Sequence, residues 1–151
     1  MIHYISLRVI AHSTEESSRV FNALGLFLKN ASETGEHDLK KEIVDSTDIQ
    51  GHYGNSFVMF SAQIKRRSDS VRLARFIREN MSPEDVKTLR NEMPDRLDDE
   101  QLFHMRFDKQ SAYLGKLVLS SSSDAITVKV KIATYPKNRL NAGLIVEELF
   151  G

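Results

Sequence analysis

The sequence predicts an α+β domain in which a mixed, mostly antiparallel sheet is covered by helices on one face. Within the segment 125–133, residues 126–132 alternate between apolar and polar side chains, and in residues 2–12 every second residue from Ile5 to Ala11 is apolar. Both patterns are typical of half-buried strands. Segments with helical spacing and cap signals lie between the strand-like segments. Strands in hairpins interspersed with helices favour an α+β fold. At 151 residues, with no repeat or linker, we expect a single domain over residues 1–151.

The first strand is expected over residues 2–12, with Ile5, Leu7, Val9 and Ala11 on its buried face. Ser13 or Thr14 then caps a helix of about fifteen residues, with Glu15 and Glu16 in its first turn. The predicted core stripe of this helix is Val20, Phe21, Leu24, Phe27 and Leu28.

Residues 30–37 are polar and contain a glycine, so we expect a loop there. Two strands, 39–47 and 56–64, would follow, joined through the loop Gly51-His52-Tyr53-Gly54-Asn55. Residues 57–60 are apolar on both faces, which favours a central position in the sheet.

Ser68 or Asp69 is expected to cap the second helix, which buries Val71, Leu73, Ala74, Phe76 and Ile77. The segment Ser82-Pro83-Glu84-Asp85 begins a third helix, because proline is favoured at the first helical position. This helix should end before Pro94.

The last third of the chain is expected to begin with a strand at 102–107 and a short turn or helical segment at 111–115. Further strands follow at 117–119 and 125–133, and a helix at 141–150 ends the chain. In the strand 125–133 the apolar residues point inward, so Lys129 and Lys131 would lie on an open face of the sheet that is available for binding.

Composition excludes several classes of protein. No run of about 18 apolar residues is present, so we expect no membrane-spanning helix and no membrane partner. The absence of cysteine excludes disulfides, thiolate zinc sites and thiol catalysis. Residues 1–12 lack the pattern of a signal peptide. We therefore expect a cytoplasmic location.

The formal net charge is zero, but the charges are segregated along the chain. Residues 65–78 carry six basic residues and one acidic residue, and residues 108–139 carry six basic and two acidic residues. Residues 84–100 are acidic instead, with seven acidic and three basic residues. A basic face that attracts nucleic acid is therefore compatible with a neutral chain.

The segment 65–78 is the clearest candidate for phosphate contacts. Lys65, Arg66 and Arg67 are consecutive, and Arg72, Arg75 and Arg78 follow at helical spacing on one side of a helix. Guanidinium groups pair with phosphate oxygens in a bidentate manner. The alternative is an ordinary solvated helix face.

The loop at residues 51–55 offers a second candidate contact. Its two glycines allow a tight turn, and His52 and Tyr53 provide flat rings that stack on bases. The alternative is a β connection with Tyr53 packed on the surface. The loop lacks the lysine and the strand-to-helix setting of a P-loop, so ATP or GTP binding is not expected.

Catalysis and metal binding are poorly supported. The five histidines form no ligand pair on a helix, so we expect no metal and no cofactor. A ribonuclease using His52, His104 and Lys109 is chemically conceivable, but nothing in the spacing brings these residues together. The run Arg106-Phe107-Asp108-Lys109-Gln110 is either a polar contact site at the sheet edge or a strand end with Asp108 capping the next turn.

Four segments carry a resemblance to known proteins: Ile5-Ser6-Leu7-Arg8, the loop 51–55, the run 106–110 with Ala112-Tyr113-Leu114-Gly115, and Val128-Lys129-Val130-Lys131-Ile132. Together they resemble an archaeal family of predicted RNA-binding proteins that are described as candidate exosome-associated subunits. The family loop is commonly preceded by Glu and followed by Pro, where this chain has Gln50 and Ser56. The resemblance implies RNA binding, and a fold similar to the large-subunit ribosomal protein that holds 5S rRNA. It implies no catalytic residues.

We therefore expect a non-catalytic RNA-binding protein that is accessory to RNA processing or exosome-type degradation. The predicted RNA contacts are His52, Tyr53, Lys65, Arg66, Arg67, Arg72, Arg75 and Lys109. Expected partners are RNA and an RNA-processing complex. The alternatives are a protein-interaction subunit without RNA contact, favoured by the neutral net charge and the acidic segment 84–100, and a small metal-independent ribonuclease.

Overall fold

The computed structural model describes the backbone of residues 1–33, 44–50 and 56–151, and the side chains of residues 1–33 and 57–151. Its strands form one five-stranded sheet in the order β2-β3-β1-β5-β4, in which every neighbouring pair is antiparallel. The strands are β1 (Ile2–His12), β2 (Val44–Gln50), β3 (Ser56–Ile64), β4 (Leu102–Phe107) and β5 (Ile126–Ile132). The expected antiparallel pairing is confirmed.

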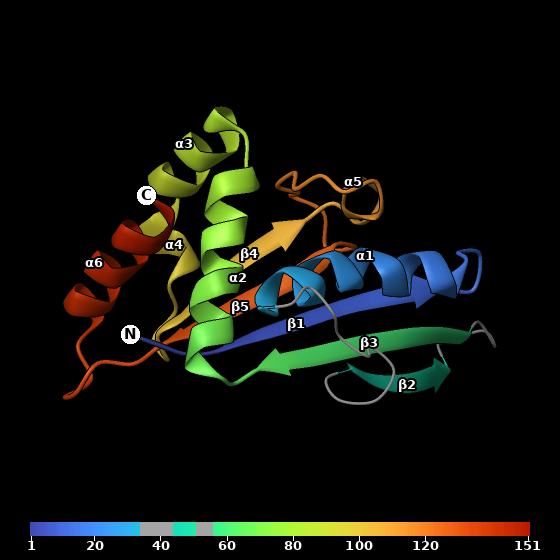
Figure 1. The fold of residues 1–151 in the computed structure, drawn as a ribbon, viewed down its shortest axis with the longest axis horizontal. Helices are drawn as coiled ribbons and strands as arrows, with labels where there is room; N and C mark the ends of the chain where they lie inside the picture. Colours follow the sequence, from blue (N-terminus) through green and yellow to red (C-terminus); the bar gives the residue numbers. More distant parts are fainter. Residues whose placement is uncertain (34–43, 51–55) are drawn as a thin grey trace.

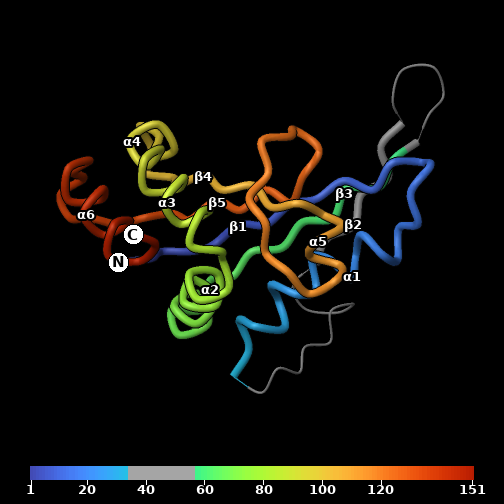
Figure 2. Tube along the Cα trace, turned by 90° about the horizontal axis from the view of Figure 1, so that it is seen from above, coloured from blue at the N-terminus to red at the C-terminus, as the bar shows by residue number. Residues whose placement is uncertain are grey.

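Helices cover one face of this sheet, as predicted (Figures 1 and 2). They are α1 (Ser17–Ala31), α2 (Arg67–Asn80), α3 (Pro83–Asn91), α4 (Met93–Arg96), α5 (Lys109–Tyr113) and α6 (Arg139–Phe150). The long helices α1 and α2 pack against β1, and α6 lies beside α2, α3 and α4 (Figure 1).

The core lies between the helices and the inward-facing residues of the sheet. In β1, Ile5, Leu7 and Val9 are buried, and β5 buries every second residue from Ile126 to Ile132. Aromatic side chains join the sheet to the helices: Phe27 of α1 lies 5.6 Å from Phe107 of β4, and Phe103 of β4 stacks on Phe150 of α6 at 5.6 Å between ring centroids. The predicted inward faces of the strands at 2–12 and 125–133 are therefore confirmed.

Two helices begin elsewhere than predicted. The first starts at Ser17 after Glu16, and neither Ser13 nor Thr14 caps it. Glu15 precedes this helix because its carboxylate accepts hydrogen bonds from the His12 backbone N–H and from Lys109. The second starts at Arg67, ahead of the predicted caps Ser68 and Asp69. The helix start at 82–85 is confirmed, since the Ser82 hydroxyl accepts a hydrogen bond from Asp85 N at 3.1 Å.

Other boundaries also shift. The strand expected at 39–47 is found at 44–50, and residues 39–43 lie outside the described part of the chain. The third helix ends at Asn91, and Pro94 then lies inside the short helix α4, where the first helical turn tolerates a residue without an N–H. The terminal helix begins at Arg139, two residues earlier than expected, because the side chain of Asn138 caps it. Val71, which was expected to be buried, is 37% exposed.

Residues 117–119 form one isolated bridge, Phe107 to Leu119, rather than the predicted strand. A second isolated bridge joins Leu97 to Phe103. Three carbonyl groups along β4 accept hydrogen bonds from outside the sheet. Asp98 N donates to Leu102 O, Arg96 Nη1 donates to His104 O, and Ser120 N donates to Arg106 O.

Among the described residues, no helix is long and apolar enough to cross a membrane.

The two faces of β1 should differ sharply in their tolerance of substitution. Leu7 is fully buried, so Leu7→Ala should lower the free energy of unfolding by about 3–5 kcal/mol. Ser6→Ala, next to it on the open face, should change that free energy by no more than about 0.5 kcal/mol. Urea denaturation of the two variants measures both values, and equal losses would contradict the two-faced sheet.

Candidate nucleic-acid interface

The antiparallel register arranges the open face of the sheet into two rows across β3, β1, β5 and β4. Residues directly opposite one another in neighbouring strands share a face and lie about 5 Å apart. We call these rows the Lys129 row and the Arg8 row. The Lys129 row consists of Gln63, Ser6, Lys129 and His104, and the Arg8 row consists of Ser61, Arg8, Thr127 and Arg106.

The rows are cationic and polar. In the described structure, the side chains of Arg8, Arg106 and Lys129 have neither a hydrogen bond nor an ion pair with the protein. The strands β1, β3, β4 and β5 place no carboxylate on this face. Lys131, at the end of β5, donates a hydrogen bond to the carbonyl of Glu100. The predicted placement of Lys129 and Lys131 on the open face is thus confirmed.

His104 is held at the end of its row by an acidic partner. Its Nε2 lies 2.8 Å from Asp98 Oδ2, while Asp98 Oδ1 accepts the backbone N–H groups of Glu100 and Leu102. Burial acts to raise the pKa of Asp98, but the hydrogen bonds from His104 and these amides outweigh it and leave the pKa below its usual value. Asp98 therefore stays ionised and fixes the imidazole in place.

The basic cluster at the start of α2 lies where β3 ends. Ile64, the last residue of β3, pairs with Ile5, so Lys65, Arg66 and Arg67 follow at the end of the sheet where β1 begins. All three side chains are exposed. The structure thus leaves them accessible to phosphate, as the predicted contacts require.

The predicted arginine stripe on α2 is largely used within the protein. Arg72 donates to the Ala31 carbonyl at 3.1 Å and to Asp69 at 3.2 Å, and Arg78 donates to the Gly151 carbonyl at 3.2 Å. These bonds fasten α2 to the ends of α1 and α6. Of the stripe, Arg75 is the member that is exposed and has no such partner in the described structure.

Lys109, one of the predicted phosphate contacts, is bonded within the protein. Its side chain is only 11% exposed, and Nζ lies 2.8 Å from both Glu15 Oε1 and Asp124 Oδ1 and 3.0 Å from the Ile10 carbonyl. The three N–H donors of the ammonium group are thus matched by three acceptors of the protein. Lys109 ties α5 to β1 and to the turn before β5.

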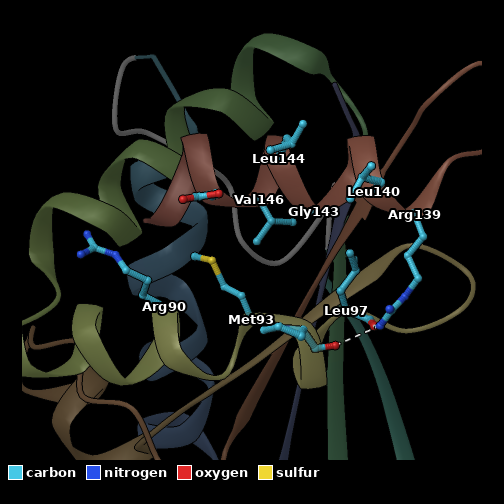
Figure 3. A pocket seen from close by; sticks show the side chains of 10 residues that line it. Arg90, Met93, Leu97, Arg139, Leu140, Gly143, Leu144 and Val146 are labelled. Carbon is cyan, nitrogen blue, oxygen red and sulfur yellow. Dashed lines mark hydrogen bonds between the residues drawn. The ribbon is translucent and has the colours of Figure 1, made fainter.

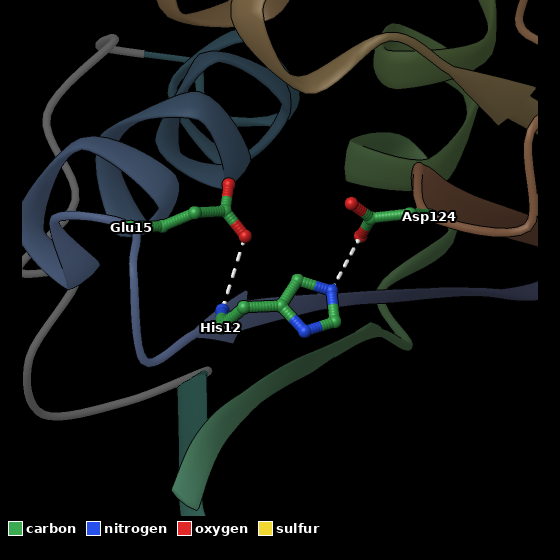
Figure 4. A group of neighbouring side chains, drawn as sticks. All are labelled: His12, Glu15 and Asp124. Atoms are coloured by element: carbon green, nitrogen blue, oxygen red, sulfur yellow. Dashed lines mark hydrogen bonds and ion pairs between the residues drawn. The ribbon is translucent and has the colours of Figure 1, made fainter. Parts of the chain in front are cut away.

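A possible cation site at this cluster is already occupied by Lys109. His12, Glu15 and Asp124 present ligand atoms within 4.8 Å of one another (Figure 4). His12 Nε2 lies 3.1 Å from Asp124, and Glu15 accepts the His12 backbone N–H at 3.0 Å. Because the ammonium bonds both carboxylates, it supplies the positive charge that a metal would bring.

The cluster changes the ionisation of Asp124. Burial acts to raise its pKa, but hydrogen bonds from Lys109 and His12, with their charges, dominate and lower the pKa below its usual value. Asp124 therefore stabilises the folded protein when it is ionised.

His52 and Tyr53 lie outside the described residues. Their predicted base contacts stay predictions. The flanking strands β2 and β3 pair up to Gln50 and Ser56.

A polar pocket of about 400 Å³ extends the open face beyond the end of β5. Lys131, Tyr135 and Lys137 are among the residues that line it. Tyr135 is 88% exposed. An exposed aromatic ring beside two lysines is suited to stacking on an unpaired base.

Comparison with known proteins also points to RNA binding. Residues 4–132 match the model of a protein family described as RNA binding. The chain belongs to this family. The match begins within β1 and ends at the last residue of β5.

Individual relatives agree with this assignment. The chain is 30% identical to the RNA-binding protein PAB1135 of Pyrococcus abyssi over 137 residues, which is 91% of this chain and 86% of the relative. It is also similar to protein AF2318 from Archaeglobus fulgidus, a member of family DUF54, whose crystal structure superposes with a TM-score of 0.80 at 26% identity and 99% coverage of both chains. Mth689 from Methanothermobacter thermautotrophicus, another DUF54 protein, shares the fold with a TM-score of 0.73 at 24% identity and 100% and 99% coverage.

The predicted membership of an RNA-binding family with archaeal relatives is therefore confirmed. The similarity to the 5S-rRNA-binding ribosomal protein stays a prediction.

Arg8 and Arg106 were not among the predicted contacts. Arg8 occupies an outward position in the alternation of residues 2–12, which is a signal in the sequence. That Arg8 lies in the same row as Arg106, two strands away, depends on the register of both pairings with β5. Alternation along one strand does not specify this register.

The ionised state of Asp124 should make part of the stability depend on pH. A carboxyl with a lowered folded pKa stabilises the fold above its unfolded value of about 3.9, and this contribution is lost as the pH falls through the folded pKa. We therefore expect Asp124→Asn to destabilise the protein at pH 7, and this loss to shrink at an acidic pH below about 3.9. Urea unfolding at both pH values tests this, with Asp99→Asn at an exposed position as the control. A loss that is equal at both pH values would contradict the role of the charge.

Proposed function

We propose that this protein binds RNA through the open face of its sheet and the adjoining cluster Lys65–Arg67, with Arg75 on α2, and does not cleave the RNA. The observation that carries the proposal is the set of unpaired cations, Arg8, Arg106 and Lys129, on the open face of a chain with zero net charge. Membership of the RNA-binding family supports it. His52 and Tyr53 remain proposed base contacts at the loop between β2 and β3.

Physical chemistry favours a phosphate partner for this surface. Cations without a carboxylate partner keep their full attraction for RNA phosphates. The strands hold the backbones of these cations at fixed spacing, so binding has to order their side chains but not the backbone. Binding of this kind should weaken steeply with salt.

A binding role without cleavage is supported by the environments of the ribonuclease candidates. His104 is bonded to Asp98, whereas Lys109 is bonded to Glu15 and Asp124, so each is engaged by a different acidic partner. We therefore propose an accessory role in RNA processing or exosome-type degradation, in the cytoplasm.

Replacement of Arg66 and Arg67 by Ala should weaken RNA binding without weakening the fold. Each change removes a cation from the start of a helix, where the helix dipole disfavours positive charge. In filter binding at low salt, we expect at least about a tenfold loss of affinity for every RNA sequence tested.

The control for this experiment is the double variant Lys87→Ala/Arg90→Ala on α3, which removes two exposed cations elsewhere. It should bind RNA as the wild type does. Equal losses in both double variants would show that overall charge, not the cluster, determines binding. A wild-type protein with no affinity for RNA at low salt would overturn the proposed function, and cleavage of labelled RNA would overturn its non-catalytic part.

A protein-interaction role is the second candidate, because an apolar groove of about 580 Å³ lies between α4 and α6 (Figure 3). Leu140 and Leu144 line it and are 77% and 58% exposed. Arg139 braces the groove by donating to the Pro94 and Leu97 carbonyls. Exposed leucines at helical spacing are typical of a surface that another protein covers.

Leu140→Asp/Leu144→Asp should separate the two roles. If the groove docks onto a complex, the double variant loses partners in a nuclease-treated pull-down while RNA affinity stays unchanged. The variant Arg66→Ala/Arg67→Ala should show the opposite behaviour. Loss of RNA affinity in the leucine variant would contradict the separation of the two surfaces.

A further inference from the structure

We propose that a small pocket in the middle of the open sheet face binds a phosphate group of the RNA backbone. This inference rests on the proposed RNA-binding function and names the chemical group that the face recognises. The pocket has a volume of about 80 Å³. It is lined by Ser6, Leu7 and Arg8 of β1, Ser61 of β3, and Thr127 and Lys129 of β5. We call it the Arg8 pocket.

The donors of the Arg8 pocket converge because of the strand register. Arg8 lies directly opposite both Ser61 and Thr127, and Ser6 lies directly opposite Lys129. Three hydroxyl groups and two cationic side chains therefore surround one point on the central strand. Hydroxyl, guanidinium and ammonium groups all donate hydrogen bonds, and tetrahedral phosphate accepts several at once.

None of these five polar side chains has a partner of its own in the described structure. The backbone groups of the strands are used in the sheet ladder, and no hydrogen bond or ion pair holds the side chains of Ser6, Arg8, Ser61, Thr127 or Lys129. The described lining residues include no carboxylate. The described lining side chains are thus not engaged by protein acceptors, and the register places Asp45 of β2 opposite Ser61 at the margin of the pocket.

The positions of the charges favour an anion. Arg8 and Lys129 are diagonal neighbours on adjacent strands, and such pairs lie roughly 7–8 Å apart at their backbones. Two like charges at this spacing repel each other, so a phosphate between them removes an unfavourable interaction as well as adding favourable ones.

The size of the pocket fits a single group and not a whole nucleotide. Sites for drug-sized ligands occupy about 300–1,000 Å³, whereas a water molecule takes up about 30 Å³ in the liquid. A pocket of about 80 Å³ lies between these values. It can hold one phosphate while the rest of the RNA extends along the two rows, toward Arg106 and His104 on one side and Gln63 on the other.

The test uses the full chain and two probes, inorganic phosphate and RNA. With ¹⁵N-labelled protein at low salt, inorganic phosphate should shift the amide signals of residues 6–8, 61 and 127–129. In Arg8→Gln/Lys129→Gln these shifts should be lost. Arg8→Lys/Lys129→Arg keeps both charges and should retain them. Lys87→Ala/Arg90→Ala is the control for charge removed elsewhere.

RNA binding by the same variants gives the second measurement. Because the pocket holds one phosphate, losing it should lower the magnitude of the slope of log affinity against log salt by about 0.7 for single-stranded RNA, and by about 0.9 if the value for B-form DNA applies to an RNA duplex. At low salt, Arg8→Gln/Lys129→Gln should lose at least about tenfold in RNA affinity. Thermal unfolding and the amide spectrum establish that the variants are folded.

The outcomes separate the pocket from the function. If RNA binds and the glutamine variant keeps wild-type affinity and salt slope, the pocket assignment is wrong while the RNA-binding function stands. If wild-type protein shows phosphate shifts in the pocket and no RNA affinity, the RNA-binding function is wrong and the site takes free phosphate. Phosphate shifts elsewhere on the protein would overturn the Arg8 pocket directly.

Discussion

The central strand β1 is the constraint on which the rest of the structure depends. It pairs with β3 on one side and β5 on the other. Its pleat therefore determines which residues of both neighbouring strands face the helices. Its buried residues, such as Leu7, form the apolar surface against which α1 and α2 pack. The same alternation sends Ser6 and Arg8 to the opposite face. A one-residue slip of this strand would bury Arg8 and expose Leu7 together, so core and candidate binding surface are specified by one register.

Charge is partitioned in a way that composition does not reveal. Several carboxylates are used to fasten the fold: Glu15 and Asp124 hold Lys109, Asp98 holds His104, and Asp69 holds Arg72. Cations of the open face have no such partners in the described structure. A chain of zero net charge can therefore still present a cationic surface, because its acids and bases are paired unequally in space.

The sequence predicted the fold well where the signal was local. Alternation located β1 and β5, and Ser82 with Pro83 located α3. Prediction failed where a distant partner decides the outcome. Glu15, expected in the first turn of α1, lies before the helix and is bonded to Lys109, 94 positions away. The same contact engages Lys109 within the protein, and the Ala31 carbonyl engages Arg72. The alternation of residues 2–12 placed Arg8 on the outward face. That Arg106 lies in the same row depends on the register of β1 and β4 with β5. Spacing along a chain cannot report such pairings.

The hydrogen bonds on the outer side of β4 have a consequence for association between molecules. β4 is the last strand of the sheet, and an exposed edge of this kind recruits strands from other chains. Here the carbonyls of Leu102, His104 and Arg106 already accept bonds from Asp98, Arg96 and Ser120. Another strand could add at this edge only after breaking those bonds. The protein can therefore be concentrated along an RNA without its molecules joining edge to edge through β4.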